Sequence, residues 1–204
     1  TVEKFNLGQV KIDRGQLLSE EEVNKLAAYK RYQITESGVS PRALPLQGKA
    51  LVVADSDEHN EEGHIIEDAE TRNKMMLKRL RKLDGLKSEL GEPLFHKAPK
   101  AELTLVGWGS TYGAIREAAA IFQKEGIGAN ILHLNELWPF PAEAVSVALS
   151  NAPKSYVIEN NATGQLARLI RTETGIKATG NILKFDGRPF SPEYIVNALK
   201  KEGV

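Results

Sequence analysis

One arginine in this 204-residue chain follows a turn that would hold it in a defined place. In the run Gly38-Val39-Ser40-Pro41-Arg42, Gly38 permits a turn and Pro41 restrains the backbone just before Arg42. A guanidinium can donate two parallel hydrogen bonds to a carboxylate or a phosphate. The sequence therefore predicts either an anchor for an anionic ligand at Arg42 or an ordinary exposed surface arginine.

An acidic run lies further along the chain. Residues 55–70 hold eight carboxylates and no lysine or arginine, whereas residues 71–87 hold seven basic side chains and one acid. Two histidines five residues apart in this loop do not by themselves have the spacing of metal ligands, so we expect no metal site. We expect a partner surface or the adjacent basic segment to compensate the mutual repulsion of the carboxylates. The residues that we expect to line an interface or a pocket here are Asp57, Glu58, His59 and His64.

A polar turn follows a short apolar segment at residues 155–158. Ligands bind at the carboxyl ends of the strands in parallel sheets, so this turn is a candidate site. The alternative is that Asn161 or Thr163 caps the helix that follows. The residues that we expect to face an interface or a pocket are Glu159, Asn160, Asn161 and Gln165.

The glycine-rich turn at residues 107–113 reads G-x-G-x-x-x-G. It is one residue longer than the dinucleotide-binding fingerprint, and no acidic residue ends the next predicted strand. We therefore favour a tight turn with a helix cap over a nucleotide site. His133 lies within an apolar strand, and we expect it to be a hydrogen-bonded core residue.

The first third of the chain contains few regular elements. Ser19 and Glu22 match a capping box, which predicts a helix that continues to about Lys30. Glycine and proline make residues 31–47 an irregular loop. The apolar run within residues 49–55 predicts a short strand.

A longer helix is expected at residues 67–83, because Met76, Leu80 and Leu83 recur at helical spacing. Acidic residues at its start and basic residues at its end suit the helix dipole. Residues 86–100 contain Pro93 and Pro99 and are expected to form a linker.

From residue 101 onward, apolar strands alternate with amphipathic helices of similar length. This alternation predicts an α/β fold with three α/β/α layers and a mostly parallel five-stranded sheet. The strands are expected near residues 103–107, 130–134, 155–158 and 182–185, and the helices near 111–125, 141–150, 164–173 and 192–201.

Composition excludes several classes of function. Lysine plus arginine equals aspartate plus glutamate at 27 each, which argues against a general nucleic-acid binder. No apolar run approaches the roughly 20 residues that span a bilayer. The absence of cysteine excludes disulfides, thiolate zinc sites, a cysteine nucleophile and an iron–sulfur cluster held by this chain. The chain opens on Thr1 without a secretory signal pattern, so we expect a fragment of a cytoplasmic protein.

Five segments follow one another along the chain in an order that is typical of one family. They are Tyr29–Arg42, Asp55–Ile65, the basic Lys78–Leu83, Glu159–Leu166 and Asp186–Phe190. Together they resemble the α subunits of 2-oxoacid:ferredoxin oxidoreductases. One departure is Leu46, where the family usually has glycine after Pro45.

The resemblance implies a domain organisation. Residues 1–45 would be a linker and the tail of a preceding pyrimidine-binding domain. Residues 46–204 would be similar to the transketolase C-terminal domain, with the first sheet strand at about 50–54 antiparallel to the others. The acidic loop and the basic helix, at 55–100, would be an insertion in this domain.

The resemblance also implies a reaction in which a 2-oxoacid, coenzyme A and oxidised ferredoxin give acyl-CoA, carbon dioxide and reduced ferredoxin. Its cofactors are thiamine diphosphate, magnesium and [4Fe-4S] clusters. This chain lacks the G-D-G…N motif that holds a magnesium diphosphate, so we expect it to be inert alone and to contain no catalytic residue. A β subunit would carry the diphosphate site and the cluster, with γ and δ subunits as further partners.

Within that reaction, Arg42 is the expected anchor of the 2-oxoacid carboxylate, with Arg31 and Thr35 as the next candidates. The residues of these segments look most like those of α subunits that act on 2-oxoglutarate, which favours 2-oxoglutarate as substrate over pyruvate or branched-chain acids. Two alternatives stay open at this point. One is a non-catalytic docking module on the same fold, and the other is the C-terminal domain of a dehydrogenase E1 β chain or a transketolase, which would share only the glycine-rich turn.

Overall fold

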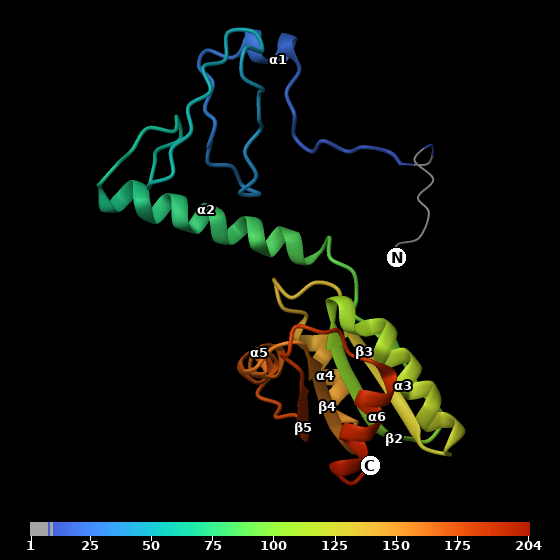
Figure 1. The fold of residues 1–204 in the computed structure, drawn as a ribbon. Coiled ribbons are helices and arrows are strands. Elements are labelled where there is room, and N and C mark those ends of the chain that lie inside the picture. Colours follow the sequence, from blue (N-terminus) through green and yellow to red (C-terminus); the bar gives the residue numbers. More distant parts are fainter. Residues whose placement is uncertain (1–7, 9) are drawn as a thin grey trace. The chain divides into compact units, whose positions relative to one another are not determined.

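The structure is a computed structural model that describes residue 8 and residues 10–204 (Figure 1). The chain divides into two compact units, the first ending at Ser88 and the second beginning at Glu89. The boundary expected at residues 45/46 therefore falls inside the first unit. Segment 46–66 belongs with the loops before it, because the backbone N–H of Tyr32 donates to the Glu61 carbonyl oxygen at 2.8 Å.

In its described residues, the first unit contains two α-helices joined by long irregular loops (Figure 1). Helix α1 spans Glu20–Lys25 and has the predicted capping box, with the Ser19 hydroxyl accepting from the Glu22 N–H at 3.2 Å. The helix ends earlier than the expected Lys30, because Leu26 has an extended backbone. Helix α2 spans Ala69–Lys87, and the Asp68 carboxylate caps it by accepting from the Thr71 N–H at 2.8 Å.

The face of α2 that is buried differs from the predicted one. Met75 and Lys78 are buried, whereas Met76 and Leu80 of the expected apolar stripe are 41% and 52% exposed. Helical spacing identifies residues that share a face but not which face meets the rest of the unit. Here the loops of the first unit pack on the side that carries Lys78.

The strand expected at residues 49–55 is absent, which corrects the sequence-based prediction. Leu51 is 74% exposed, so this apolar run is not in a sheet interior. The antiparallel strand is instead β1, Leu94–His96, within the stretch that was expected to be a linker. It pairs with the open edge of β3, and the prolines on either side of it are compatible with a short edge strand.

The second unit is built on one five-stranded sheet of order β1-β3-β2-β4-β5. The antiparallel edge strand β1 pairs Phe95 with Leu132, and the other neighbouring strands are parallel. The predicted α/β class and mostly parallel sheet are thus confirmed. The parallel strands are β2 Ala101–Trp108, β3 Gly128–Leu134, β4 Ser155–Glu159 and β5 Gly180–Leu183.

Helices cover both faces of this sheet, which gives the expected three layers (Figure 1). On one face, Ile115 and Phe122 pack with Ile195 and Leu199, and all four are fully buried. On the other face, Val145 and Ile170 pack onto the opposite side of the sheet. The first pair of helices is α3 Tyr112–Lys124 and α6 Pro192–Lys201, and the second is α4 Ala142–Ser150 and α5 Gln165–Thr174.

Within the part of the chain that the structure describes, no helix combines the length and the apolar character that crossing a membrane requires.

Candidate anion-binding site

A pocket of about 310 Å³ lies in the first unit, between the turn that carries Arg42 and helix α2. Among the described residues that line it, five side chains are basic and none is acidic. We call this cavity the basic pocket. The basic residues are Arg14, Arg31, Arg42, Lys78 and Lys82.

Gly38 allows the turn to lie directly on the backbone of α2. Its φ is +78°, and a Cβ at this position would be 2.5 Å from the Lys78 carbonyl oxygen and 2.8 Å from the Lys82 nitrogen. Any larger residue would push the turn away from the helix. Thr35 closes the turn from inside, because its hydroxyl donates to the Val39 carbonyl oxygen at 3.0 Å.

The backbone of Arg42 is fixed on both sides. Its N–H donates to the Gln16 carbonyl oxygen at 2.8 Å, and its own carbonyl accepts from the Leu18 N–H at 2.9 Å. One guanidinium nitrogen, Nη2, donates to the Arg14 carbonyl oxygen at 3.2 Å. No carboxylate lines the pocket to neutralise this guanidinium, so it remains available to an anionic ligand.

The other two residues predicted to bind substrate have different positions. Arg31 lines the basic pocket together with Arg42, and its guanidinium carbon lies 5.0 Å from the centre of the Tyr32 ring. Thr35 lines a neighbouring hollow and uses its hydroxyl within the turn. The structure therefore brings the two arginines together and leaves Thr35 outside the basic pocket.

Lys78 is the most buried basic residue of the pocket, with 7% of its surface exposed. Its Nζ donates to the Tyr32 carbonyl oxygen at 3.0 Å. Burial, followed by the positive charges of Lys82, Arg31 and Arg79, lowers the pKa of Lys78 to about 8. Sequence reasoning missed Lys78 and Lys82, although it identified both the turn and the basic helix, because nothing local shows that segments so far apart meet.

The acidic run is compensated in part by the basic helix, as the sequence predicted. Glu58 accepts two hydrogen bonds from Arg79, with Nη1–Oε1 at 3.1 Å and Nη2–Oε2 at 2.7 Å. Arg72 Nη1 lies 3.7 Å from Glu58 Oε2. The hydrogen bonds and charge of Arg79 hold the pKa of Glu58 below its usual value, although burial opposes this. Glu58 thus ties the acidic loop to α2.

Glu61 connects the same loop to the segment that bears Arg31. Its carboxylate accepts from Lys30 Nζ and from the Ile34 N–H, both at 2.8 Å. Burial of Glu61 opposes its ionisation, but these hydrogen bonds outweigh that effect and lower its pKa. The carboxylates of the loop therefore order the wall of the basic pocket without entering it.

The histidines of the acidic loop do not come together as ligands. His59 stacks on Tyr32 with ring centres 3.8 Å apart, and its Nδ1 lies 3.0 Å from the Asn60 carbonyl oxygen. Asp57 and His64 are exposed and lie outside the pocket. Among the described residues, no group of three or more histidine, aspartate or glutamate side chains is arranged to hold a metal ion.

The polar turn after β4 starts helix α5. Glu159 is fully buried, and its carboxylate accepts from the N–H groups of Leu166 and Ala167 at 2.7 and 3.1 Å. Asn161 donates to Glu159 at 2.8 Å, and its Oδ1 accepts from the backbone N–H groups of residues 163–165. These contacts support the alternative of a cap at the start of the helix.

Asn160 and Gln165 flank this cap. Asn160 Nδ2 donates to the Lys184 carbonyl oxygen at 3.5 Å, and Gln165 is exposed. Neither residue, nor Glu159 or Asn161, lines the basic pocket. Their predicted role at an interface remains a prediction.

The glycine-rich turn after β2 is a tight turn, as expected. The Thr111 hydroxyl donates to the Trp108 carbonyl oxygen at 2.8 Å and accepts from the Trp108 N–H at 3.2 Å. His133 is buried, but its Nδ1 has no hydrogen-bond partner, so the hydrogen bond expected at this core residue is not made at that atom. Burial lowers the pKa of His133.

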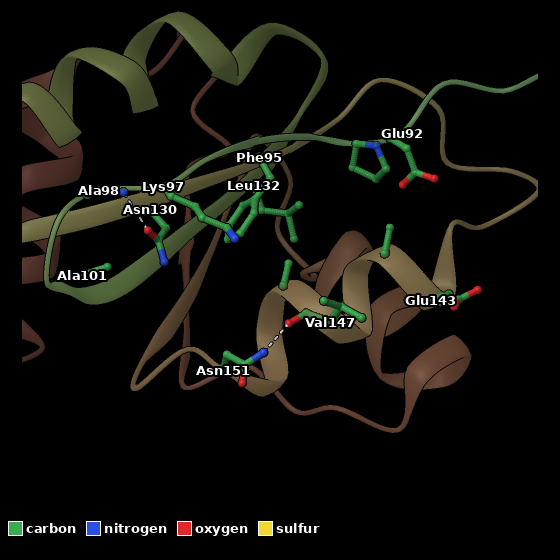
Figure 2. Close-up of a pocket in the computed structure, with 13 residues that line it drawn as sticks. Glu92, Phe95, Lys97, Ala98, Ala101, Asn130, Leu132, Glu143, Val147 and Asn151 are labelled. Carbon is green, nitrogen blue, oxygen red and sulfur yellow. Dashed lines mark hydrogen bonds between the residues drawn. The ribbon is translucent and has the colours of Figure 1, made fainter.

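The second unit contains a larger pocket of about 620 Å³. Figure 2 shows Phe95 and Leu132 on its sheet side and Val147 on its α4 side. Asn130 accepts from the Ala98 N–H at 2.9 Å, and Asn151 donates to the Val147 carbonyl oxygen at 3.1 Å. The remaining charged lining residues, Glu92, Lys97 and Glu143, have charges of both signs. The basic pocket gathers charges of one sign and is therefore the better candidate site for an anion.

Comparison with known proteins gives consistent matches. Residues 101–195 match the family described as pyruvate:ferredoxin oxidoreductase core domain II. The α subunit of 2-oxoacid:ferredoxin oxidoreductase 2 from Aeropyrum pernix is 36% identical over 98% of this chain and 30% of its own length. The α subunit of 2-oxoacid:ferredoxin oxidoreductase 1 from Sulfurisphaera tokodaii is 34% identical over 98% of this chain and 31% of its own length.

A solved structure also matches both units of the chain. It is the 2-oxoglutarate:ferredoxin oxidoreductase from Magnetococcus marinus with 2-oxoglutarate, coenzyme A and succinyl-CoA bound. The TM-score is 0.77 at 32% identity, over 88% of this chain and 31% of that chain. The present chain thus spans about 30% of the length of the curated relatives that it matches.

Proposed function

We propose that this chain, which belongs to the family of 2-oxoacid:ferredoxin oxidoreductase α subunits, acts as the C-terminal part of such a subunit in the cytoplasm. In this function the assembled enzyme joins the acyl group of a 2-oxoacid to coenzyme A, releases carbon dioxide and passes electrons to ferredoxin. The chain supplies subunit contacts and part of the substrate pocket.

The observation that carries the proposal is the meeting of Arg42 and Arg31 in a pocket whose lining has no acidic side chain. A 2-oxoacid has a carboxylate next to the carbonyl carbon that reacts. Arg42 is the anchor for this carboxylate, since a guanidinium pairs with it through charge-assisted hydrogen bonds worth roughly 1.5–3 kcal/mol. Arg31 adds a second positive charge to the lining of the same pocket, and the fixed backbone of Arg42 orients the substrate.

Other parts of the enzyme hold the cofactors in this proposal. The chain has no cysteine for a [4Fe-4S] cluster, and its described residues include no cluster of ligands suited to magnesium. Thiamine diphosphate, when bound, supplies the carbanion that attacks the carbonyl carbon of the substrate. We assign its diphosphate site and the iron–sulfur cluster to a β subunit, with γ and δ subunits as further partners.

Reconstitution tests the proposed function. A full-length α subunit that contains this chain is co-expressed with candidate β subunits, and the reduction of ferredoxin is followed with 2-oxoglutarate, pyruvate and branched-chain 2-oxoacids. We expect reduction that requires both a 2-oxoacid and coenzyme A, with 2-oxoglutarate the best substrate. A stable, cofactor-loaded complex that reduces ferredoxin with none of these acids would contradict the proposal.

A further inference from the structure

The charged side chains that line the basic pocket, among the described residues, all have the same sign, because all five are basic. Two carboxylates of the acidic loop are paired with other cations, since Glu58 pairs with Arg79 and Glu61 pairs with Lys30. The charge of Glu61 acts on Lys78 in the opposite direction to those of the basic residues, but as the smallest of the influences on it. Like charges that line one small pocket repel one another, and burial also disfavours a charged amine, so the pocket without a ligand favours loss of a proton from an amine that is buried.

Lys78 is the amine placed to lose that proton. It is the one basic residue of the pocket lining that is more than nine-tenths buried. Its hydrogen bond goes to the uncharged carbonyl oxygen of Tyr32, at 3.0 Å, rather than to a carboxylate. Arg14, Arg31 and Arg42 keep their charge at any pH that a folded protein survives. The positive charge of the pocket can therefore decrease only if a lysine loses a proton.

We propose that the basic pocket is a carboxylate site in which Lys78 takes up a proton when the anion enters. An anion beside Lys78 compensates the charges of Arg31 and Lys82 and stabilises the ammonium form. This inference rests on the proposed function only for the identity of the natural ligand, which is the carboxylate of the 2-oxoacid. The coupling between anion binding and protonation of Lys78 follows from the arrangement of charges in the pocket.

The direction of the pH dependence follows from linkage. Bound anion raises the pKa of Lys78 above the value of about 8 that burial and the neighbouring cations impose on the empty pocket. Below pH 8 the amine is protonated in both states, and the affinity for carboxylate is constant. Above pH 8 each binding event takes up a proton, so the affinity falls by about tenfold per pH unit until the raised pKa is reached.

Several charged and titratable groups surround Lys78 on four segments of the first unit. Carboxyl and imidazole groups in general have already lost their protons by pH 8, and arginine has not, so these types do not produce a change above pH 8. The groups of those types are Arg14, Arg31, Arg42, His59, Glu61 and Arg79. Tyr32 and Lys82 also surround Lys78, and phenols and primary amines in general titrate at about pH 10. The test therefore follows the signal of Lys78 itself in addition to the affinity.

The test follows Lys78 directly. The 204-residue chain is labelled with ¹³C at the lysine Cε, and the NMR signal of Lys78, assigned by its loss in Lys78→Arg, is titrated from pH 6 to 11 with and without saturating succinate. Succinate is unreactive and fully ionised above pH 7. We expect the Lys78 titration midpoint to rise by at least one pH unit with succinate, and the affinity for succinate to fall by the matching factor, at least about tenfold in total, between pH 7 and pH 11.

Lys74 is the matched control, since it lies on the same helix outside the pocket lining and pairs with Glu70 at 2.5 Å. The hydrogen bond to Glu70 and the charge of Glu70 raise the pKa of Lys74, and succinate should leave the titration of Lys74 unchanged. A Lys78 signal that titrates like that of Lys74, or that ignores saturating succinate, would overturn the proposal.

A second variant keeps the test independent of how well Lys78→Arg folds. Lys82→Gln removes a positive charge that lowers the pKa of Lys78. The Lys78 midpoint in the empty pocket should therefore move to higher pH, and the succinate-induced rise should become smaller. An unchanged midpoint in Lys82→Gln would also overturn the proposal. A proton-coupled succinate site in a chain whose assembled enzyme fails to turn over 2-oxoacids would refute the proposed function and leave this inference intact.

Discussion

The backbone of Gly38 lies against that of Lys78 so closely that a Cβ on Gly38 would be 2.5 Å from the Lys78 carbonyl oxygen. This contact joins two segments that the chain separates by 40 residues. One segment carries Arg42 after a proline, and the other carries Lys78 within α2. The basic pocket exists because these two backbones touch.

Replacing Gly38 should therefore damage the pocket more than an ordinary loop substitution would. We expect Gly38→Ala to lower the free energy of unfolding of the first unit by about 1–3 kcal/mol, since alanine disfavours a φ of +78° and its Cβ meets the helix backbone. Chemical denaturation followed by circular dichroism measures the loss.

Gly85→Ala is the control, because Gly85 lies on α2, the helix that Gly38 contacts. Nothing lies within 4 Å of a Cβ at Gly85, and the residue sits inside α2, so the substitution should stabilise the unit by about 0.5–1 kcal/mol. Equal effects of the two substitutions would show that the Gly38 contact has no special weight.

The two-point ion pair between Glu58 and Arg79 should show energetic coupling. The Glu58 side chain is 13% exposed and that of Arg79 is 41% exposed, so we expect a double-mutant cycle with Glu58→Gln and Arg79→Gln to give about 0.5–1 kcal/mol. Additive single effects would mean that the pair adds no stability.

The same pair should make stability depend on pH at acidic values. The pKa of Glu58 is lowered from its ordinary 4.5 in the folded state, so the folded protein resists protonation of this group. The contribution of Glu58 is complete above pH 4.5 and is lost as the pH falls through the lowered pKa. The stability difference between wild type and Glu58→Gln should shrink over that window, and a difference that stays constant down to pH 3 would contradict the assignment.

Asn161 should act as a cap in which both ends of its amide are needed. Asn161→Ala removes an acceptor for three backbone N–H groups and should cost about 1–2 kcal/mol. Asn161→Asp keeps the acceptor but places a carboxylate beside buried Glu159, in place of a donor at 2.8 Å. Asn161→Asp should therefore be less stable than Asn161→Ala at pH 7 and should recover on acidification, as thermal unfolding at pH 4 and pH 7 would show.

The sequence predicted the second unit well, because its information is local. Each helix and parallel strand there has its own periodicity, and α6 also has its own start signal in Ser191, which caps it, followed by Pro192. The strand expected at 49–55 failed because an apolar run of five residues does not reveal whether a sheet edge is available to it. β1 forms a strand with only three residues, since it pairs with the open edge of β3.

The candidate site was predicted only in part, because it depends on contacts over long separations. The turn at Arg42 was predicted from Gly38 and Pro41, and the acidic run as a whole was expected to be compensated by a partner surface or by the adjacent basic helix. Lys78 as a pocket residue was not visible, since its role depends on which face of α2 meets the turn. That choice is made by packing of the loops, which no periodicity records.

Substitution of Arg42 by lysine tests the central claim most directly. In the reconstituted enzyme, Arg42→Lys keeps the positive charge but loses the two-point geometry that holds a carboxylate. We predict at least a tenfold higher KM for the 2-oxoacid, which corresponds to about 1.4 kcal/mol, and an unchanged KM for coenzyme A. An unchanged KM for the 2-oxoacid in a fully assembled complex would contradict the assignment of the substrate carboxylate to Arg42.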